Sequence, residues 1–168
     1  MPVDFVVVPP KIFLFFLGGV LLVVLLAVIL KRGDIRKKMT ALVIALVVIG
    51  GVAFLFYRPT VVSVGERGFS MKRFLARSVP WAEVTEVKWI GDLPASEYRP
   101  TRRVVGVSLG SYRVGTFRLK DGGRAQAVME QTRDAYLIVT AKDRYLFALA
   151  DGDRFAEAVG RFVEVSKR

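Results

Sequence analysis

The sequence contains neither cysteine nor histidine. Without cysteine the chain forms no disulfide, no thiolate nucleophile and no acyl anchor on sulfur. Without both residues, zinc and haem sites of the usual kind are excluded. A Ser-His-Asp triad is excluded as well, because its imidazole must carry the serine proton. These absences remove most cofactor-bearing classes of protein and the commonest hydrolases, and we expect no cofactor.

One hydrolase pattern is nevertheless present. Residues 106–110, GVSLG, fit the GxSxG motif that holds a serine nucleophile on a strand-to-helix turn. A Ser-Lys dyad needs no histidine, but the lysine nearest to Ser108 along the chain is Lys120. The residues from 113 to 120 alternate like a strand and do not form the helix that the motif requires. We therefore predict that Ser108 is no nucleophile, that there is no catalytic residue and that the chain is not an enzyme.

Charge is missing from two long runs, although 24% of all residues are charged. Residues 12–30 and 39–57 are each 19 residues long and uncharged. As helices rising about 1.5 Å per residue, they nearly match the roughly 30 Å hydrocarbon core of a bilayer. A cleaved signal peptide is the rival interpretation of the first run, but the basic start and the small-residue cleavage site are lacking. We predict a protein that crosses the cytoplasmic membrane twice.

The segment between the runs, KRGDIRKK at 31–38, holds five cations and one anion. So short a connection predicts an antiparallel transmembrane hairpin over residues 1–58. The positive-inside tendency favours a cytoplasmic loop and an extracytoplasmic C-terminal domain. Over a wider window, to residue 73, each side carries five cations, so the side of the membrane stays open.

Four glycines would lie at one depth in this hairpin. If the loop is centred between residues 34 and 35, Gly18 faces Gly51 and Gly19 faces Gly50. Helices associate in lipid through close backbone approach at small residues, so these glycines are candidate helix-packing positions. The alternative is that glycine is simply common in membrane helices.

After residue 59 the pattern changes to short segments rich in β-branched and aromatic residues, separated by turn signals. It predicts strands at 60–64, 68–74, 84–90, 104–109, 114–120, 124–130, 135–141 and 144–150. Turns are predicted at 65–68 and at 121–123, where Asp-Gly tolerates positive φ. An amphipathic segment predicts a C-terminal helix at about 151–165, capped by Asp151 or Asp153. With no third ligand nearby, these two carboxylates are not a metal site.

The order of these elements resembles the bacterial pleckstrin-homology-like (PH-like) domain over about residues 60–165. The residues that carry the resemblance are VPWAEV at 79–84, RVVG at 103–106 continuing to Gly110, GTF at 115–117, and the closing helix with Phe155. The two apolar runs also look like those of membrane-anchored members. The resemblance implies that residues 59–168 form two orthogonal antiparallel sheets, or a partly open barrel, capped by the helix. It also implies a non-catalytic binding or scaffold module without a defined ligand.

The resemblance gives the glycines of this stretch a structural role. Gly106 and Gly110 would let a strand bend or end, and Gly115 would let two backbones approach closely. Residues of the phosphoinositide-binding loops do not carry over, because the turn at 65–68 offers only Arg67, with Lys72 and Arg73 beyond it.

Positive charge is the remaining candidate for function. Residues 58–168 hold 20 Lys and Arg against 13 Asp and Glu, a net charge of +7. Arg99, Arg102, Arg103 and Arg113 are grouped around the glycine-bearing stretch and are candidate contacts for anionic lipid headgroups. The alternative is an ordinary solvated basic face. No aromatic-basic motif favours nucleic acid as a partner.

Two functional hypotheses follow. In the first, the chain is a membrane-anchored module that binds a protein or a lipid surface. In the second, it is an accessory or sensory subunit of a transporter or envelope-stress system, and the hairpin makes the specific contact with an unknown protein partner.

Overall fold

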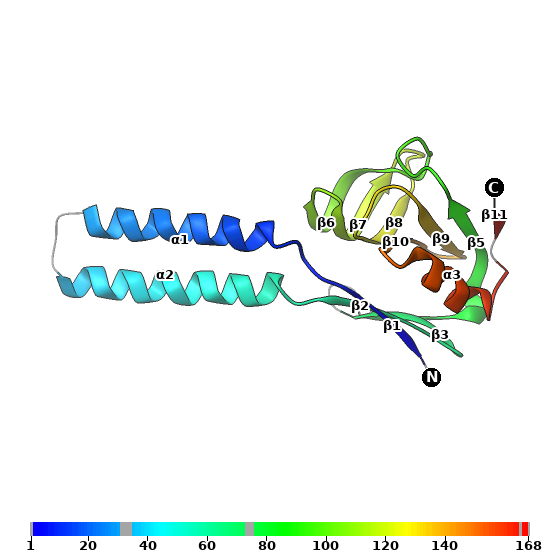
Figure 1. Ribbon diagram of the computed structural model, residues 1–168, viewed down its shortest axis with the longest axis horizontal. Coiled ribbons are helices and arrows are strands. Elements are labelled where there is room, and N and C mark those ends of the chain that lie inside the picture. The colour runs from blue at the N-terminus through cyan, green and yellow to red at the C-terminus, as the bar shows by residue number, and fades with distance from the viewer. Residues whose placement is uncertain (1, 31–34, 73–75, 165, 168) are drawn as a thin grey trace. The chain divides into compact units, whose positions relative to one another are not determined.

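The computed structural model describes residues 2–30, 35–72, 76–164 and 166–167. The chain divides into two compact units, Val8–Arg58 and Met1–Val7 with Pro59–Arg168, which we call the hairpin unit and the β domain (Figure 1). The sequence predicts residues 1–58 together as the hairpin. Strand β1 (Val3–Val7) belongs to the β domain instead, because it pairs antiparallel with β2 (Thr60–Gly65). The hairpin unit is thus an insertion between two paired strands.

The hairpin unit consists of helices α1 (Ile12–Leu30) and α2 (Ile35–Phe56). Helix α1 has the predicted bounds, whereas α2 starts at Ile35 instead of residue 39 and takes in half of the expected loop. Arg and Lys are good helix formers, so the segment from 35 to 38 continues the helix. Residues 31–34, the rest of the expected loop, lie outside the described part. Of the helices in the described ranges, none is long and apolar enough to cross a membrane. The two spans therefore stay a prediction.

The four glycines of the hairpin lie beside open space. A Cβ atom added at Gly18, Gly19, Gly50 or Gly51 would meet no atom within 4 Å in the described part of the unit. The helix packing predicted at these positions stays a prediction. Equal depth along two helices is not enough for contact, because each residue must also face the partner helix.

One sheet of the β domain has four strands in the order β1-β2-β3-β4, and all its pairs are antiparallel. Strands β3 (Gly68–Lys72) and β4 (Arg77–Pro80) follow β2 along the chain. A short 3₁₀ turn, η1 (Trp81–Glu83), leads from β4 to the second sheet. The indole Nε1 of Trp81 donates a hydrogen bond to the Gly65 carbonyl oxygen at 2.8 Å and fixes this turn against the β2–β3 hairpin.

The second sheet has seven strands in the order β11-β5-β9-β10-β8-β7-β6. Their bounds are β5 Val84–Ile90, β6 Pro100–Leu109, β7 Tyr112–Leu119, β8 Arg124–Met129, β9 Ala135–Thr140, β10 Arg144–Ala148 and β11 Ser166–Lys167. The expectation of purely antiparallel sheets is wrong, because β8 pairs parallel with β10 and β5 pairs parallel with β11. Strands β8, β9 and β10 reverse direction in turn, so β8 and β10 run in the same direction. Because β10 and not β9 lies beside β8, this pair is parallel.

Helix α3 (Gly152–Gly160) closes the core and ends earlier than the predicted residue 165. Its buried Phe155 lies edge-on to Phe5 of β1, with ring centroids 5.4 Å apart, and 5.1 Å from the ring of Phe147 in β10. Phe162 lies beyond the helix and stacks on Trp81 instead, at 5.7 Å. Asp151 holds the N-cap position, as predicted, but its side chain makes no capping hydrogen bond.

Candidate functional site

Of the predicted basic residues, Arg102 and Arg103 lie in the edge strand β6, Arg99 lies in the loop before it, and Arg113 lies in the neighbouring strand β7. Arg99, Arg102 and Arg103 are exposed, and Arg113 is half-buried. Val104 and Val105, which follow in the same strand, are 46% and 63% exposed. The pairing of β6 with β7 shifts register between Pro100 and Arg102 and again between Arg103 and Val105. This irregular edge strand leaves its basic and apolar side chains open to solvent.

Arg113 does not belong with the exposed arginines. Its Nη1 donates a hydrogen bond to the Pro100 carbonyl oxygen at 3.1 Å, and its Nε is buried without a hydrogen-bond partner among the described residues. A guanidinium held in this way braces the β6–β7 hairpin and is poorly placed to meet a ligand. We therefore remove Arg113 from the candidate contacts.

Arg118 and Arg124, which the sequence did not single out, form a line with Arg102 across three strands. Arg102 of β6 is the register partner of Arg118 in β7, and Arg118 is the partner of Arg124 in β8. All three side chains are exposed. We call these three residues the arginine row. Directly opposite residues of an antiparallel pair have Cβ atoms about 4.5–5.5 Å apart, so the row concentrates three positive charges.

The β7–β8 hairpin places Arg118 and Arg124 opposite each other. Its turn uses Gly122 at φ +85°, and the Asp121 side chain accepts a hydrogen bond from the Gly123 amide at 2.8 Å. Residues at equal distances from Asp121 therefore face each other, as Arg118 and Arg124 do. The Asp-Gly turn was visible in the sequence and could have identified this pair. The Arg102–Arg118 partnership could not be found in that way, because a register shift between Arg103 and Val105 separates it from the regular part of the β6–β7 hairpin.

The arginine row marks the place where the core between the sheets ends. Val114, Thr116 and Arg118 share one face of β7, since alternate residues of a strand point to the same side. Exposure increases along this face: Val114 is 3% exposed, Thr116 is half-buried and Arg118 is exposed. The row thus carries its charge at the rim of the sheet and not inside it.

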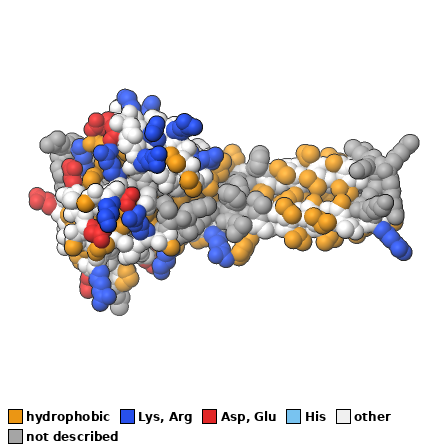
Figure 2. Space-filling model, turned by 180° about the vertical axis from the view of Figure 1, so that it is seen from behind, with side chains coloured by type: hydrophobic (Ala, Val, Ile, Leu, Met, Phe, Trp, Pro, Cys, Tyr) orange, Lys and Arg blue, Asp and Glu red, His pale blue; other side chains and the backbone are white. Residues whose placement is uncertain are grey.

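No carboxylate in the described ranges pairs with the row. The segment from 99 to 124 contains seven Lys and Arg and one acid, Asp121. That carboxylate is already paired with Arg144 of β10. The ion pairs found among the described side chains leave Arg102, Arg118 and Arg124 unpaired. Figure 2 shows Lys and Arg side chains gathered over this part of the β domain.

A buried amide lies next to the row. Gln126, the register partner of Thr116, is 8% exposed, and its Oε1 has no hydrogen-bond partner among the described residues. It shares a face of β8 with Arg124, two residues away. A buried amide without its hydrogen bond costs free energy, so this position favours a polar ligand group.

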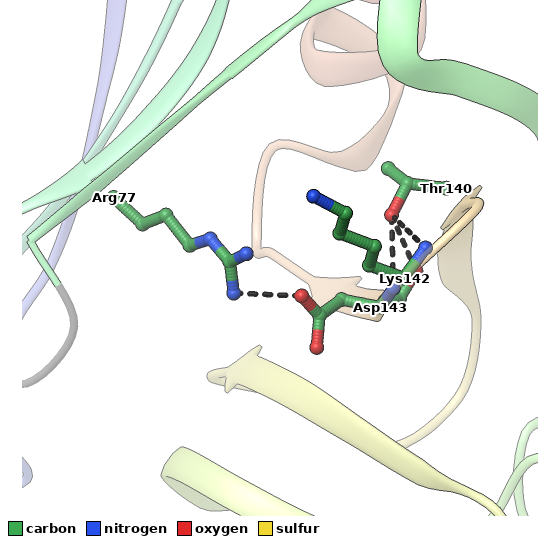
Figure 3. Close-up of polar contacts among 4 residues, drawn as sticks. All are labelled: Arg77, Thr140, Lys142 and Asp143. Atoms are coloured by element: carbon green, nitrogen blue, oxygen red, sulfur yellow. Dashed lines mark hydrogen bonds and ion pairs between the residues drawn. The ribbon is translucent and has the colours of Figure 1, made fainter.

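A second polar cluster joins the two sheets and contains the carboxylate of Asp143, which is already paired (Figure 3). Arg77 of β4 forms an ion pair with Asp143, in the turn between β9 and β10, with Nη1 and Oδ2 2.7 Å apart. Thr140 holds that turn, because its hydroxyl accepts a hydrogen bond from the Asp143 amide at 3.0 Å and donates one to the Asp143 carbonyl oxygen at 2.9 Å. This clamp has a structural role.

The structure does not place Ser108 on a nucleophile elbow. It lies in β6 opposite Arg113, and a two-residue turn at Gly110 and Ser111 leads directly into β7. A nucleophile elbow needs a helix at this point. Gly106 and Gly115 face each other with φ of +120° and +136°, and a Cβ at Gly106 would lie 2.7 Å from the Gly115 Cα. The predicted close approach of backbones at Gly115 is confirmed. Gly106 of GVSLG serves this packing, whereas Gly110, at φ +59°, lies in the turn that ends β6.

Comparison with known proteins agrees with this architecture. Residues 63–162 match the family described as the bacterial PH domain. No curated protein and no solved structure gives a significant match. The match covers more than half of the chain, from within β2 through helix α3, and leaves out β1 and β11. The chain therefore belongs to the bacterial PH domain family.

Proposed function

We propose that this chain is a non-catalytic, membrane-anchored binding module that contacts an anionic surface through the arginine row. The observation that carries the proposal is the register alignment of Arg102, Arg118 and Arg124 without a carboxylate partner in the described part of the chain. Like charges placed opposite each other destabilise a sheet, so an arrangement of this kind is best explained by a ligand that neutralises it.

The anchor is proposed from the sequence. Residues 12–30 and 39–57 contain no charged side chain, and the short connection at 31–38 carries five cations. With the loop in the cytoplasm, the β domain would lie outside the cytoplasmic membrane. Reaction of a single cysteine, introduced at Ser111, with a membrane-impermeant thiol reagent on intact cells tests this side. The chain has no other cysteine that could react.

Anionic lipid headgroups are the surface that we propose. Each Lys or Arg close to an anionic membrane contributes about 1 kcal/mol at low ionic strength. The three arginines of the row together would then contribute about 3 kcal/mol, or roughly a hundredfold in affinity. The exposed Val104 and Val105 would add apolar contact with the interface.

The test uses the full chain held in nanodiscs of phosphatidylcholine, over which vesicles rich in phosphatidylglycerol are passed. We expect binding that is lost on replacing Arg102, Arg118 and Arg124 together by glutamine. A matched control replaces three other exposed cations, Arg67, Arg133 and Lys142, and leaves binding nearly unchanged at the same net charge. Equal losses in the two triple variants would show that only net charge matters, and would overturn the proposal.

A second candidate function keeps the hairpin as the specific contact. The open space beside Gly18, Gly19, Gly50 and Gly51 in the described part of the unit would admit a helix of another integral membrane protein. On this proposal the chain is an accessory or sensory subunit of a transporter or envelope-stress system. A stoichiometric partner that co-purifies in mild detergent, and is lost when the four glycines are changed to leucine, would favour it over the first candidate.

A further inference from the structure

A pocket of about 530 Å³ lies between the seven-stranded sheet and helix α3. Its floor includes Trp89 of β5 and Tyr136 of β9, which are direct register partners in the antiparallel pair and so present their rings on the same face. Its other wall includes Asp153, Ala156, Glu157 and Gly160, a set at the spacing of one helix face. The small side chains of Ala156 and Gly160 leave room between helix and sheet.

The lining of this pocket is acidic, although the β domain as a whole is basic. Four carboxylates line it, those of Asp134, Asp153, Glu157 and Glu164, and no Lys or Arg belongs to the lining among the residues whose side chains the structure describes. Two of the four are partly engaged, since Asp134 accepts a hydrogen bond from Gln131 at 2.8 Å and Glu157 pairs with exposed Arg161 at 2.7 Å. Asp153 and Glu164 have no ion pair or hydrogen bond through their side chains among the described residues.

The phenol of Tyr136 is the second feature of this pocket. The side chain is only 7% exposed, and its hydroxyl makes no hydrogen bond in the described part of the chain. Burial raises the pKa of Tyr136, and the negative charges of Asp134 and Asp153 raise it further. The hydroxyl therefore stays protonated at neutral pH and faces the acidic side of the pocket. A phenol oxygen in this position accepts a hydrogen bond from an N–H group.

We propose that this pocket binds an aliphatic diamine or polyamine. A protonated amine lies favourably over the faces of Trp89 and Tyr136, and its N–H groups donate to the Tyr136 hydroxyl and to the carboxylates. Quaternary ammonium ions carry no N–H donor and would leave the phenol oxygen unpaired. Carboxylates on both walls favour a ligand with more than one positive charge, and the pocket volume lies in the range of small-molecule sites.

The test is calorimetric titration of the full chain, in a nonionic detergent at low salt, with spermidine. We expect one site per chain and at least tenfold weaker binding in the double variant Asp153→Asn, Glu164→Gln. The matched control Glu83→Gln, Glu86→Gln removes the same charge from exposed carboxylates outside the pocket and should bind as the parent does. Tyr136→Phe keeps the ring and should weaken binding several-fold with little change in thermal unfolding.

Choline, a monovalent quaternary ammonium ion, tests whether the pocket prefers a polyvalent amine with N–H donors over a single positive charge without them. We expect it to bind at least tenfold more weakly than spermidine. Three results would overturn the proposal: no heat of binding with millimolar spermidine, equal affinities for choline and spermidine, or equal losses in the pocket and control double variants. None of these depends on the arginine row, so failure here leaves the proposed anionic contact to its own test.

Discussion

Replacement of Arg118 by glutamine tests whether the arginine row is held at a cost in stability. Arg118 is the middle member, with Arg102 and Arg124 directly opposite it on the two neighbouring strands. At about 7 Å in water, two unit charges repel by about 0.6 kcal/mol. Removal of the central charge relieves two such repulsions, about 1 kcal/mol in all. We therefore expect Arg118→Gln to stabilise the β domain while it weakens binding to anionic vesicles.

The gain should appear in thermal unfolding as an increase of roughly 4 °C at low ionic strength, and it should fall by about half near physiological salt, where the screening length is about 8 Å. Tryptophan fluorescence is a suitable measurement. Both tryptophans of the chain, Trp81 and Trp89, lie in the β domain, so the signal reports its unfolding separately from the hairpin unit.

Two controls isolate the charge. Arg118→Lys keeps the positive charge and should unfold near the parent temperature, whereas Arg133→Gln removes an exposed charge far from the row in sequence and should have little effect. The Thr101 hydroxyl donates to the backbone carbonyl of Arg118 at 3.0 Å, a contact that every substitution preserves. A lower unfolding temperature for Arg118→Gln at low salt would refute the reasoning, because it would show that the charge stabilises the sheet.

Three further predictions concern the same domain. Gly106→Val should destabilise it by at least about 2 kcal/mol in urea unfolding, because valine would be strained at φ +120° and its side chain would meet the backbone of β7. Gly110→Asn should cost less than about 1 kcal/mol, because Gly110 has φ +59° and open space around it. Arg113→Gln should lower the unfolding temperature without a selective loss of vesicle binding, and Arg103→Gln should leave the unfolding temperature within about 1 °C. Burial raises the pKa of Tyr145 above 10.0, although nearby Arg77 opposes this. Since the folded state then holds this proton more tightly than the unfolded state, stability should fall as pH rises from about 10 through the folded pKa, and Tyr145→Phe should reduce the fall in a pH series of urea unfolding curves.

Much of the local structure could be predicted from the sequence. The run at 12–30 coincides with α1, and the segment at 84–90 coincides with β5. Local composition sets these elements, through apolar length in one case and β-branched content in the other. Strand β1 was missed because its neighbour β2 lies more than fifty residues away along the chain, and a single strand without its partner gives a weak signal. Helix α3 was predicted too long, since the apolar Phe162 leaves the helix to stack on Trp81.

The candidate site was only partly predictable. Arg102 and Arg103 were found through the density of positive charge along the chain, and both are exposed. The same criterion also selected Arg113, which the fold half-buries and hydrogen-bonds, because density along a sequence does not show which side chain a fold will hold in this way. It also passed over Arg118 and Arg124, which are separated along the chain by a turn but are brought together by strand register.

The sequence by itself determined the chemistry that is absent and the kinds of element that are present. A chain without histidine or cysteine has no imidazole base and no thiolate, whatever its fold, and the spacing of its apolar residues fixes local helix and strand. Only the tertiary structure decided which charges meet. Strand order and register depend on packing between distant segments. They align three arginines across β6, β7 and β8, and they bring four carboxylates together beside two aromatic rings near helix α3.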